Sequence, residues 1–292
     1  MKGEKIYYYL EHTHREKGKV KKKELYLGNT IPKDIEEQKR KFLEETYNKK
    51  WYKTFDEIKN NFFKERKQMP PSAKKKELET FMISFTYNTQ KLEGSTLSLR
   101  ETANLLEKGI TPKEKPIKDS KEAEAHKIVF YNMLSYEKDL SQQIILQWHK
   151  TLFEQTKKDI AGKIRQHQVG IAGSKFLPPS PVEVYPSLQD FFSWYQKNKS
   201  VLHPVELASL IHLKFVTIHP FSDGNGRLSR LIMNFVLKKY SYPMMDIPYE
   251  NHSGYYTALE RAQVKKEERI FVQWFFKRYT KEYKSFIRKS SL

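Results

Sequence analysis

The sequence predicts a mainly α-helical fold with two small β-hairpins. Apolar residues recur at helical spacing over most of the 292-residue chain, whereas β-branched residues, glycine and proline concentrate in short segments. Hydrophobic residues make up 38% and aromatic residues 14% of the composition, which is enough to form a buried core. No internal repeat is evident, so the length favours one large domain or two smaller ones over a solenoid.

The N-terminal part of the chain is predicted to form a region of its own. Two β-rich runs within residues 5–27 flank Lys17-Gly18-Lys19, which is the pattern of a β-hairpin. Residues 33–68 have the charged, amphipathic pattern of one helix or two. Because Met69-Pro70-Pro71-Ser72 interrupts that pattern, we place the boundary there, between residues 1–70 and residues 71–292.

The larger region is predicted to be a helical bundle that contains a second hairpin. Gly94 and Gly109 stand where helix-ending glycines are expected, and Ser120 and Ser141 can cap the helices that follow them. The composition of residues 161–185, rich in glycine, proline and β-branched residues, predicts a short β-hairpin. The expected helices are residues 73–93, 97–108, 120–134, 141–153, 186–195, 204–218 and 227–240, with further helical periodicity in residues 253–292.

The charge and the cysteine count limit the classes of function. The formal net charge is +19, which attracts polyanions, but the basic residues are spread along the chain as on a solvated surface, so nucleic acid is not the favoured partner. The absence of cysteine excludes disulfides and thiolate metal sites. No apolar run approaches the ~18 residues of a membrane span, and no signal peptide is evident, so we expect a soluble, cytoplasmic protein without a membrane partner.

A glycine-rich loop, HPFSDGNGRLSR at residues 219–230, joins two apolar helices and carries the chemistry of the chain. Backbone N–H groups at the start of the second helix form an anion site, and Arg227 and Arg230 share one face of its first turns. Asp223 can hold Mg²⁺ against phosphates, and His219 can act as a general base near neutral pH. This combination predicts phosphoryl or nucleotidyl transfer.

The loop matches the HxFxDGNGRxxR signature of the Fic family, whose members transfer AMP from ATP to protein hydroxyls. The stretch GKIRQHQVGIAGSKFLPPSPVEV resembles the flap of that family, a β-hairpin that aligns an acceptor peptide. The resemblance covers about residues 75–280 and implies a Fic-type helical bundle with a flap at about 166–185.

The resemblance also implies a role for each residue of the loop, with Mg²⁺-ATP as the cosubstrate. His219 would deprotonate a Ser, Thr or Tyr hydroxyl, and Asp223 would hold Mg²⁺. Arg227 would bind the β-phosphate and Arg230 the γ-phosphate. The remaining implied positions are the phosphate cradle Gly224, Asn225 and Gly226, the acceptor-binding flap residues Ser174, Lys175, Phe176 and Leu177, and Tyr255 or Tyr256 on the adenine side.

A second motif, TQKLEG at residues 89–94, closes the helix that precedes it and matches the [S/T]xxxE[G/N] inhibitory motif of Fic proteins. Thr89 and Glu93 lie one turn apart on one face, and Gly94 follows as the helix-ending residue. By this resemblance, Glu93 on an inhibitory helix at about 78–94 would pair with Arg230 and block a productive pose of ATP.

Several alternatives stay open from the sequence. The same site could remove AMP from a modified protein, with Glu93 positioning a water molecule, or the chain could be a nucleic-acid- or protein-binding module with an inactive Fic core. The acceptor is expected to be another protein or the chain itself, and a homodimer is left open. The histidines at 203, 212 and 219 fit no zinc spacing, and Glu122 and Glu124 point apart on a helix, so neither set is expected to form a site.

Overall fold

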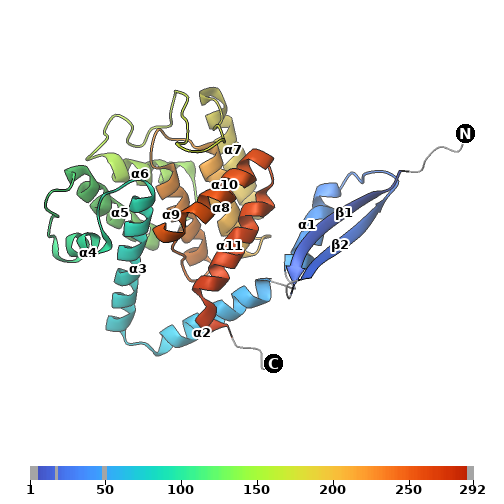
Figure 1. Ribbon diagram of the computed structural model, residues 1–292, viewed down its shortest axis with the longest axis horizontal. Helices are drawn as coiled ribbons and strands as arrows, with labels where there is room; N and C mark the ends of the chain where they lie inside the picture. Colours follow the sequence, from blue (N-terminus) through green and yellow to red (C-terminus); the bar gives the residue numbers. More distant parts are fainter. Residues whose placement is uncertain (1–5, 17–18, 48–50, 288–292) are drawn as a thin grey trace, which may run out of the picture. The chain divides into compact units, whose positions relative to one another are not determined.

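The computed structural model describes residues 6–16, 19–47 and 51–287. The chain divides into two compact units, Met1–Glu57 and Ile58–Leu292. The ribbon in Figure 1 shows the elements, coloured and labelled in chain order. The predicted break at residues 69–72 separates helix α2 (Lys53–Gln68) from helix α3 (Pro71–Leu92).

The first unit contains an antiparallel hairpin of β1 (Tyr8–Glu16) and β2 (Lys19–Gly28), followed by α1 (Ile35–Tyr47). The predicted hairpin is confirmed; two residues of its expected turn, Lys17 and Gly18, lie outside the described residues. Tyr9 pairs with Tyr26 across the strands, and both side chains are more than half exposed. His12 is buried, because successive side chains of a strand point to opposite faces.

The second unit is helical throughout its regular part. After α3 come α4 (Leu99–Lys108), α5 (Ile117–Ser135), α6 (Gln142–Phe153), α7 (Pro181–Asn198), α8 (Pro204–Ile218), α9 (Asn225–Lys239), α10 (His252–Lys265) and α11 (Glu268–Glu282), with short 3₁₀ turns at Tyr249–Asn251 and Lys284–Phe286. Within the described ranges no helix is both long enough and apolar enough to cross a membrane.

Helices α8 and α9 form the centre of this unit. They pack against each other, and α3, α5, α6, α7 and α11 cover one or the other of them. Both are buried along most of their length, which for α8 agrees with a sequence that is apolar at most positions. The loop between them, residues 219–224, therefore begins and ends on buried, rigid helices.

Serine side chains cap the starts of two helices, and the helix end predicted at Gly109 is confirmed. Ser98 forms a capping box with Glu101 at the start of α4, and Ser141 accepts a hydrogen bond from the backbone of Ile144. Gly109 ends α4 in the left-handed conformation, with φ +68°. The prediction for Ser120 was wrong: α5 begins at Ile117, and Pro116 takes the N-cap position, where a proline is tolerated because no helical N–H is lost.

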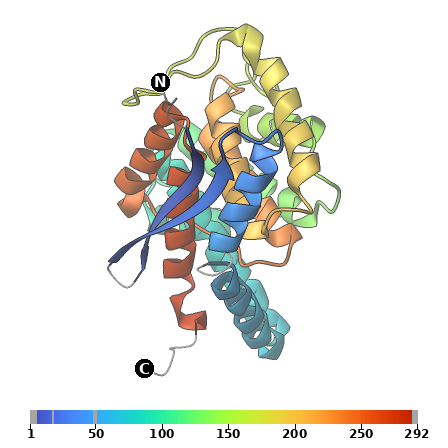
Figure 2. The ribbon, with the colours of Figure 1, turned by 90° about the vertical axis from the view of Figure 1, so that its right-hand side faces the viewer.

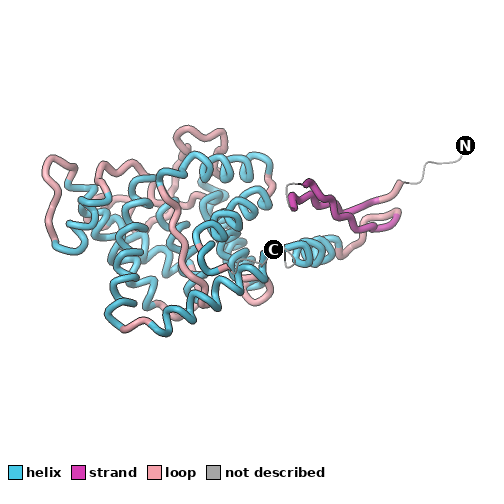
Figure 3. The backbone as a smooth tube through the Cα atoms, turned by 60° about the horizontal axis from the view of Figure 1, so that its bottom comes forward, coloured by secondary structure: helices cyan, strands magenta, loops and turns pink. Residues whose placement is uncertain are grey.

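The predicted β-hairpin at residues 161–185 was wrong. Figure 3 shows strands only in the first unit, and residues 163–180 form a loop, visible before α7 in Figure 2. Pro178 and Pro179 have no N–H group to donate to a ladder, and the side-chain amide of Gln168 donates to the Pro178 carbonyl at 3.1 Å. Side chains thus satisfy several carbonyls of this segment, among them those of His167, Pro178 and Pro179, and no second strand pairs with them.

Helix α7 also begins earlier than the sequence predicted. It starts at Pro181 rather than at Pro186, because Ser180 and Glu183 form a capping box and Pro181 takes the first helical position. Pro186 lies inside the helix, within its first two turns. The last five residues predicted for the flap, 181–185, are therefore helical.

Candidate functional site

The loop between α8 and α9 holds two residues in the left-handed conformation. His219 ends α8 with φ +51°, and Gly224 precedes α9 with φ +80°. A side chain at position 224 would meet the ring of Phe153, since an added Cβ would lie 2.5 Å from its Cε2 atom. The conformation and the close approach together require glycine at position 224.

Asn225 closes this loop through its side chain. Its Oδ1 atom accepts a hydrogen bond from the Phe221 N–H at 2.9 Å, and its Nδ2 atom donates to the Phe221 carbonyl at 2.8 Å. Both polar groups of the buried amide are therefore engaged within the loop. The resemblance implied that Asn225 is part of a phosphate cradle. In the structure, the side-chain amide of Asn225 stabilises the turn.

His149, on α6, supports the same loop. Its Nδ1 atom accepts a hydrogen bond from the Gly162 N–H at 2.9 Å, so the proton of a neutral ring is on Nε2, which donates to the Asp223 carbonyl at 3.1 Å. The ring stacks on Phe221 with centroids 3.8 Å apart. Burial lowers the pKa of His149 to about 4, so the ring is neutral at pH 7.

His219 has the properties of a general base. Its Nδ1 atom lies 3.2 Å from the Val216 carbonyl, which can only accept, so a neutral ring carries its proton there and its lone pair on Nε2. Burial lowers the pKa of His219 below its ordinary value, and the nearby Arg165 guanidinium acts in the same direction. The neutral form therefore predominates at pH 7.

Arg165 connects the predicted flap with the loop between α8 and α9. The buried guanidinium donates to the carbonyls of His219 at 2.7 Å, His167 at 3.0 Å and Pro179 at 2.6 Å. The backbone N–H of Arg165 also donates to the Pro220 carbonyl at 3.0 Å. This side chain, which the sequence analysis did not single out, holds both ends of the 166–180 loop against His219.

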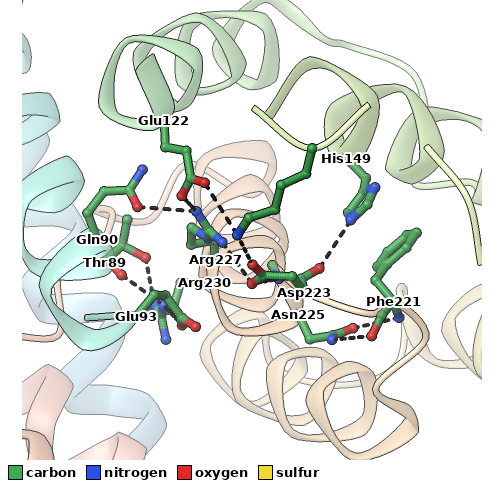
Figure 4. A network of polar contacts seen from close by, with 12 residues as sticks. Thr89, Gln90, Glu93, Glu122, His149, Phe221, Asp223, Asn225, Arg227 and Arg230 are labelled. Atoms are coloured by element: carbon green, nitrogen blue, oxygen red, sulfur yellow. Dashed lines mark hydrogen bonds and ion pairs between the residues drawn. The ribbon is translucent and has the colours of Figure 1, made fainter. Parts of the chain in front are cut away.

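Arg230 is paired with the predicted inhibitory helix. Its Nη2 atom lies 2.6 Å from Glu93 Oε1, and its Nε atom donates to Thr89 Oγ1 at 2.7 Å (Figure 4). Its Nη1 atom donates to the Tyr255 hydroxyl at 3.3 Å. Burial opposes the charge of Arg230, but Tyr255 and Glu93 raise its pKa above the ordinary value, so it stays a cation. The pair expected between Glu93 and Arg230 is thus present in the structure.

Arg227 lies in a second charge cluster, a turn of α9 away. Its Nη2 atom lies 2.9 Å from Asp223 Oδ1, and its Nη1 atom contacts Glu122 and, at 3.3 Å, Gln90 Oε1 (Figure 4). The arginine side chain is almost fully buried, so these partners fix its position. Glu122 was not expected from the sequence to form a site, because no local signal connects it with Arg227, which lies 105 residues further along the chain.

Asp223 receives two cations. Arg227 contacts its Oδ1 atom and the Lys157 ammonium its Oδ2 atom. Burial would raise the pKa of Asp223, but Arg227 and Lys157 hold it below the ordinary value, so the carboxylate is charged. In the described part of the chain, no group of three or more His, Cys, Asp or Glu side chains could hold a metal. A single hard carboxylate suits Mg²⁺ that takes its other ligands from water and phosphates.

A cleft of about 710 Å³ brings the predicted residues together. Its lining includes His219, Glu93, Arg230, Gly226 and Tyr256. Tyr255 also lines it but is itself buried against His212, with 3.0 Å between the Tyr255 hydroxyl and His212 Nε2. Asp223, Asn225 and Arg227 are not among the residues that line this cleft: the side chains of Asn225 and Arg227 are buried, and that of Asp223, which is 32% exposed, faces Arg227 and Lys157.

Three of the four predicted flap residues line one of two hollows. Ser174 lines the cleft with His219, and the Lys175 N–H donates to Glu260 Oε2 at 3.0 Å. Phe176 and Leu177 line a second cleft of about 670 Å³, together with Trp194 of α7. The loop thus contributes side chains both to the histidine cleft and to an apolar hollow beside it.

The helical fold and the glycine-rich loop between α8 and α9 together are typical of one family of helical domains. Residues 139–237 match the family model described as the Fic/DOC family, and the chain therefore contains a Fic domain. The relatives found include protein adenylyltransferase fic-1 of Caenorhabditis briggsae, 32% identical over 78% of this chain, and that of Caenorhabditis elegans, 33% identical over 68%. These matches cover 45% and 40% of the relatives, so the chain spans less than half their length.

Solved structures give the same family. A Fic-domain-containing signalling protein from Bacteroides thetaiotaomicron superposes with a TM-score of 0.71 at 29% identity, covering 79% of this chain and 95% of the other. Residues 134–508 of Fic-1 from C. elegans superpose with a TM-score of 0.70 at 26% identity, covering 87% of this chain and 75% of the other. The mainly helical Fic fold predicted from the sequence is thereby confirmed.

Proposed function

We propose that this chain is a protein adenylyltransferase, which transfers AMP from Mg²⁺-ATP to a hydroxyl group of a protein. The observation that carries the proposal is the shared cleft: a neutral histidine, a buried arginine and the start of a helix face one hollow. The activity in the names of the C. briggsae and C. elegans relatives supports the same reaction.

In the proposed reaction, the hydroxyl oxygen of the acceptor attacks the α-phosphorus of ATP, the bond to the β-phosphate oxygen breaks, and pyrophosphate leaves. His219 takes the hydroxyl proton on Nε2, the ring nitrogen that does not face Val216. Bound Mg²⁺ would neutralise charge on the phosphates, and Asp223 is the residue that would hold it. Arg230 would stabilise the phosphate charge once it is released from Glu93.

We propose further that Glu93 inhibits this reaction within the chain. Its carboxylate occupies the guanidinium of Arg230 and lies at the start of α9, where the positive end of the helix dipole attracts anions. A phosphate group of ATP would need the same cation and the same end of the helix. The carboxylate therefore stands where a phosphate would bind, and its removal opens the position.

The experiment is mass spectrometry of the whole protein after incubation with Mg²⁺-ATP. Glu93→Gly is expected to gain adenylate, on itself or on an added protein, more than about tenfold faster than the unaltered chain, which corresponds to ~1.4 kcal/mol. Glu93→Gln, which keeps the size but removes the charge, should fall between the two. His219→Ala in the Glu93→Gly background should show no transfer.

Equal and rapid labelling by the unaltered chain and Glu93→Gly would contradict the inhibition. Absence of adenylate on any protein, together with release of AMP from a modified protein that is lost in Glu93→Gly, would instead support removal of AMP. Salt-dependent binding of nucleic acid without turnover by any variant would support the inactive binding module. The acceptor protein, self-modification, a homodimer and a cytoplasmic location stay predictions.

A further inference from the structure

Lys157 places an ammonium group between two carboxylates of the second charge cluster. It contacts Asp223 Oδ2 and lies 3.5 Å from Glu122 Oε1. Lys157 follows α6 in a tight turn, where its N–H donates to the Phe153 carbonyl at 2.8 Å. Neither the loop signature nor the inhibitory motif contains this lysine. The proposed reaction therefore gives Lys157 no role.

The two oxygens of Asp223 have different partners. Oδ1 faces Arg227 (Figure 4) and the Gly224 N–H, whereas Oδ2 faces Lys157. Glu122 Oε1 is buried and accepts no hydrogen bond, so the Lys157 ammonium at 3.5 Å neutralises this oxygen by electrostatic attraction. Lys157 therefore already occupies the oxygen of Asp223 that is turned away from Arg227.

The two cations on Asp223 differ in their freedom to leave. The side chain of Arg227 is only 2% exposed and is held by Glu122 and Gln90 as well. The side chain of Lys157 is 36% exposed and ends in a compact ammonium on a flexible stem. A divalent cation that approaches Asp223 would consequently displace Lys157 and leave Arg227 in place.

We propose that Lys157 competes with the divalent cation for Asp223 and thereby sets the cation concentration that the site requires. The proposal rests on the proposed function, because it assumes a cation that accompanies ATP at Asp223. A divalent cation can bind Asp223 only if the attraction between Lys157 and this carboxylate is lost. The free energy of that attraction is subtracted from the binding free energy of the divalent cation, so the affinity of the site for the cation is lowered. Removal of the ammonium should therefore strengthen cation binding.

The test is calorimetric titration of Mn²⁺, as a probe for Mg²⁺, in the Glu93→Gly background. It is done with and without α,β-methylene-ATP, in which the bond broken by AMP transfer is replaced. Lys157→Met is expected to bind Mn²⁺ about tenfold more tightly than its parent, or ~1.4 kcal/mol. Lys158→Met, which removes the same charge from the neighbouring exposed lysine, should leave the affinity unchanged.

The outcomes separate this proposal from the proposed function. Equal Mn²⁺ affinity in Lys157→Met and its parent, an equal gain in Lys158→Met, or no Mn²⁺ binding by any variant would overturn the competition. Failure of the nucleotide to bind at any Mn²⁺ concentration would count against AMP transfer, and the titration with Mn²⁺ alone would still decide about Lys157. Should Lys157→Met not fold, Lys157→Gln removes the charge and keeps a polar side chain.

Discussion

The Glu93 Oε1 atom lies 2.3 Å from the position that a Cβ atom would take on Gly226, and in the same place Arg230 Nη1 lies 3.1 Å from it. A glycine at the start of α9 thus leaves the room that a carboxylate fills. Gly226, which belongs to the proposed phosphate cradle, and Glu93, which is proposed to block it, therefore lie next to each other. This contact links the two sequence motifs, which lie more than a hundred residues apart in the chain.

Gly226→Ala should destabilise the fold by displacing Glu93. The new methyl group has no room beside the carboxylate, so the pair with Arg230 breaks and a buried cation loses its partner, at a cost of about 3 kcal/mol. In the Glu93→Gly background the same substitution should cost much less, because the clash is gone. Urea unfolding of the two single variants and the double variant measures this coupling.

Additive effects of the two substitutions in that cycle would contradict the contact. An alanine at position 226 is otherwise acceptable, since the residue lies in a helix and has no positive φ. A large loss in both backgrounds would point to some other steric conflict of the methyl group.

Gly224→Ala should cost more than about 2 kcal/mol of stability. The residue has φ +80°, and the added Cβ would lie 2.5 Å from the Phe153 ring, which is buried and cannot move aside. Gly254 is the matched control: it lies in α10, and an added Cβ would come no closer than 3.8 Å to its neighbour. Gly254→Ala should be neutral or stabilising by about 0.5–1 kcal/mol in the same thermal unfolding assay.

Arg165→Met should release the 166–180 loop while the helices stay folded. The substitution removes three hydrogen bonds to backbone carbonyls, one of them on His219. Limited proteolysis should cut within this loop several-fold faster than in the unaltered chain, because its backbone opens more often. Lys163→Met removes an exposed side chain from the same segment and serves as control; equal cleavage of both variants would argue against the anchor.

His149 should make the stability of the fold depend on pH. Its pKa is about 4 in the folded chain and about 6.5 when unfolded, so the unfolded state binds more protons between these values. The stabilisation is present above pH 6.5 and is lost as the pH falls towards 4, by about 1 kcal/mol between pH 7 and pH 5.5. His149→Phe keeps a ring against Phe221 and should lose less stability over this interval than the unaltered chain.

Urea unfolding at the two pH values provides the comparison for His149. An identical loss of stability in His149→Phe and the unaltered chain would contradict a neutral His149 in the folded state.

Local patterns predicted the helices that position the site. Apolar runs predicted α8 and α9, Ser141 marked the start of α6, and Gly109 marked the end of α4, because hydrophobic periodicity and capping act over a few residues. The prediction of a hairpin at residues 161–185 was wrong, because glycine and proline are as common in an anchored loop as in a hairpin. Its course is decided by Arg165, whose bonds reach across the fold to His219.

The sequence by itself determined the chemical groups of the site: a histidine, an aspartate, two arginines and a glycine-rich turn within twelve residues, and a glutamate upstream. Only the tertiary structure decided how these charges are paired. Folding places Glu122 beside Arg227 and Lys157 beside Asp223, and it pairs Arg230 with Glu93. These pairs could not be predicted locally, because ion pairs form between side chains that folding brings within about 4 Å, whatever their separation in the chain.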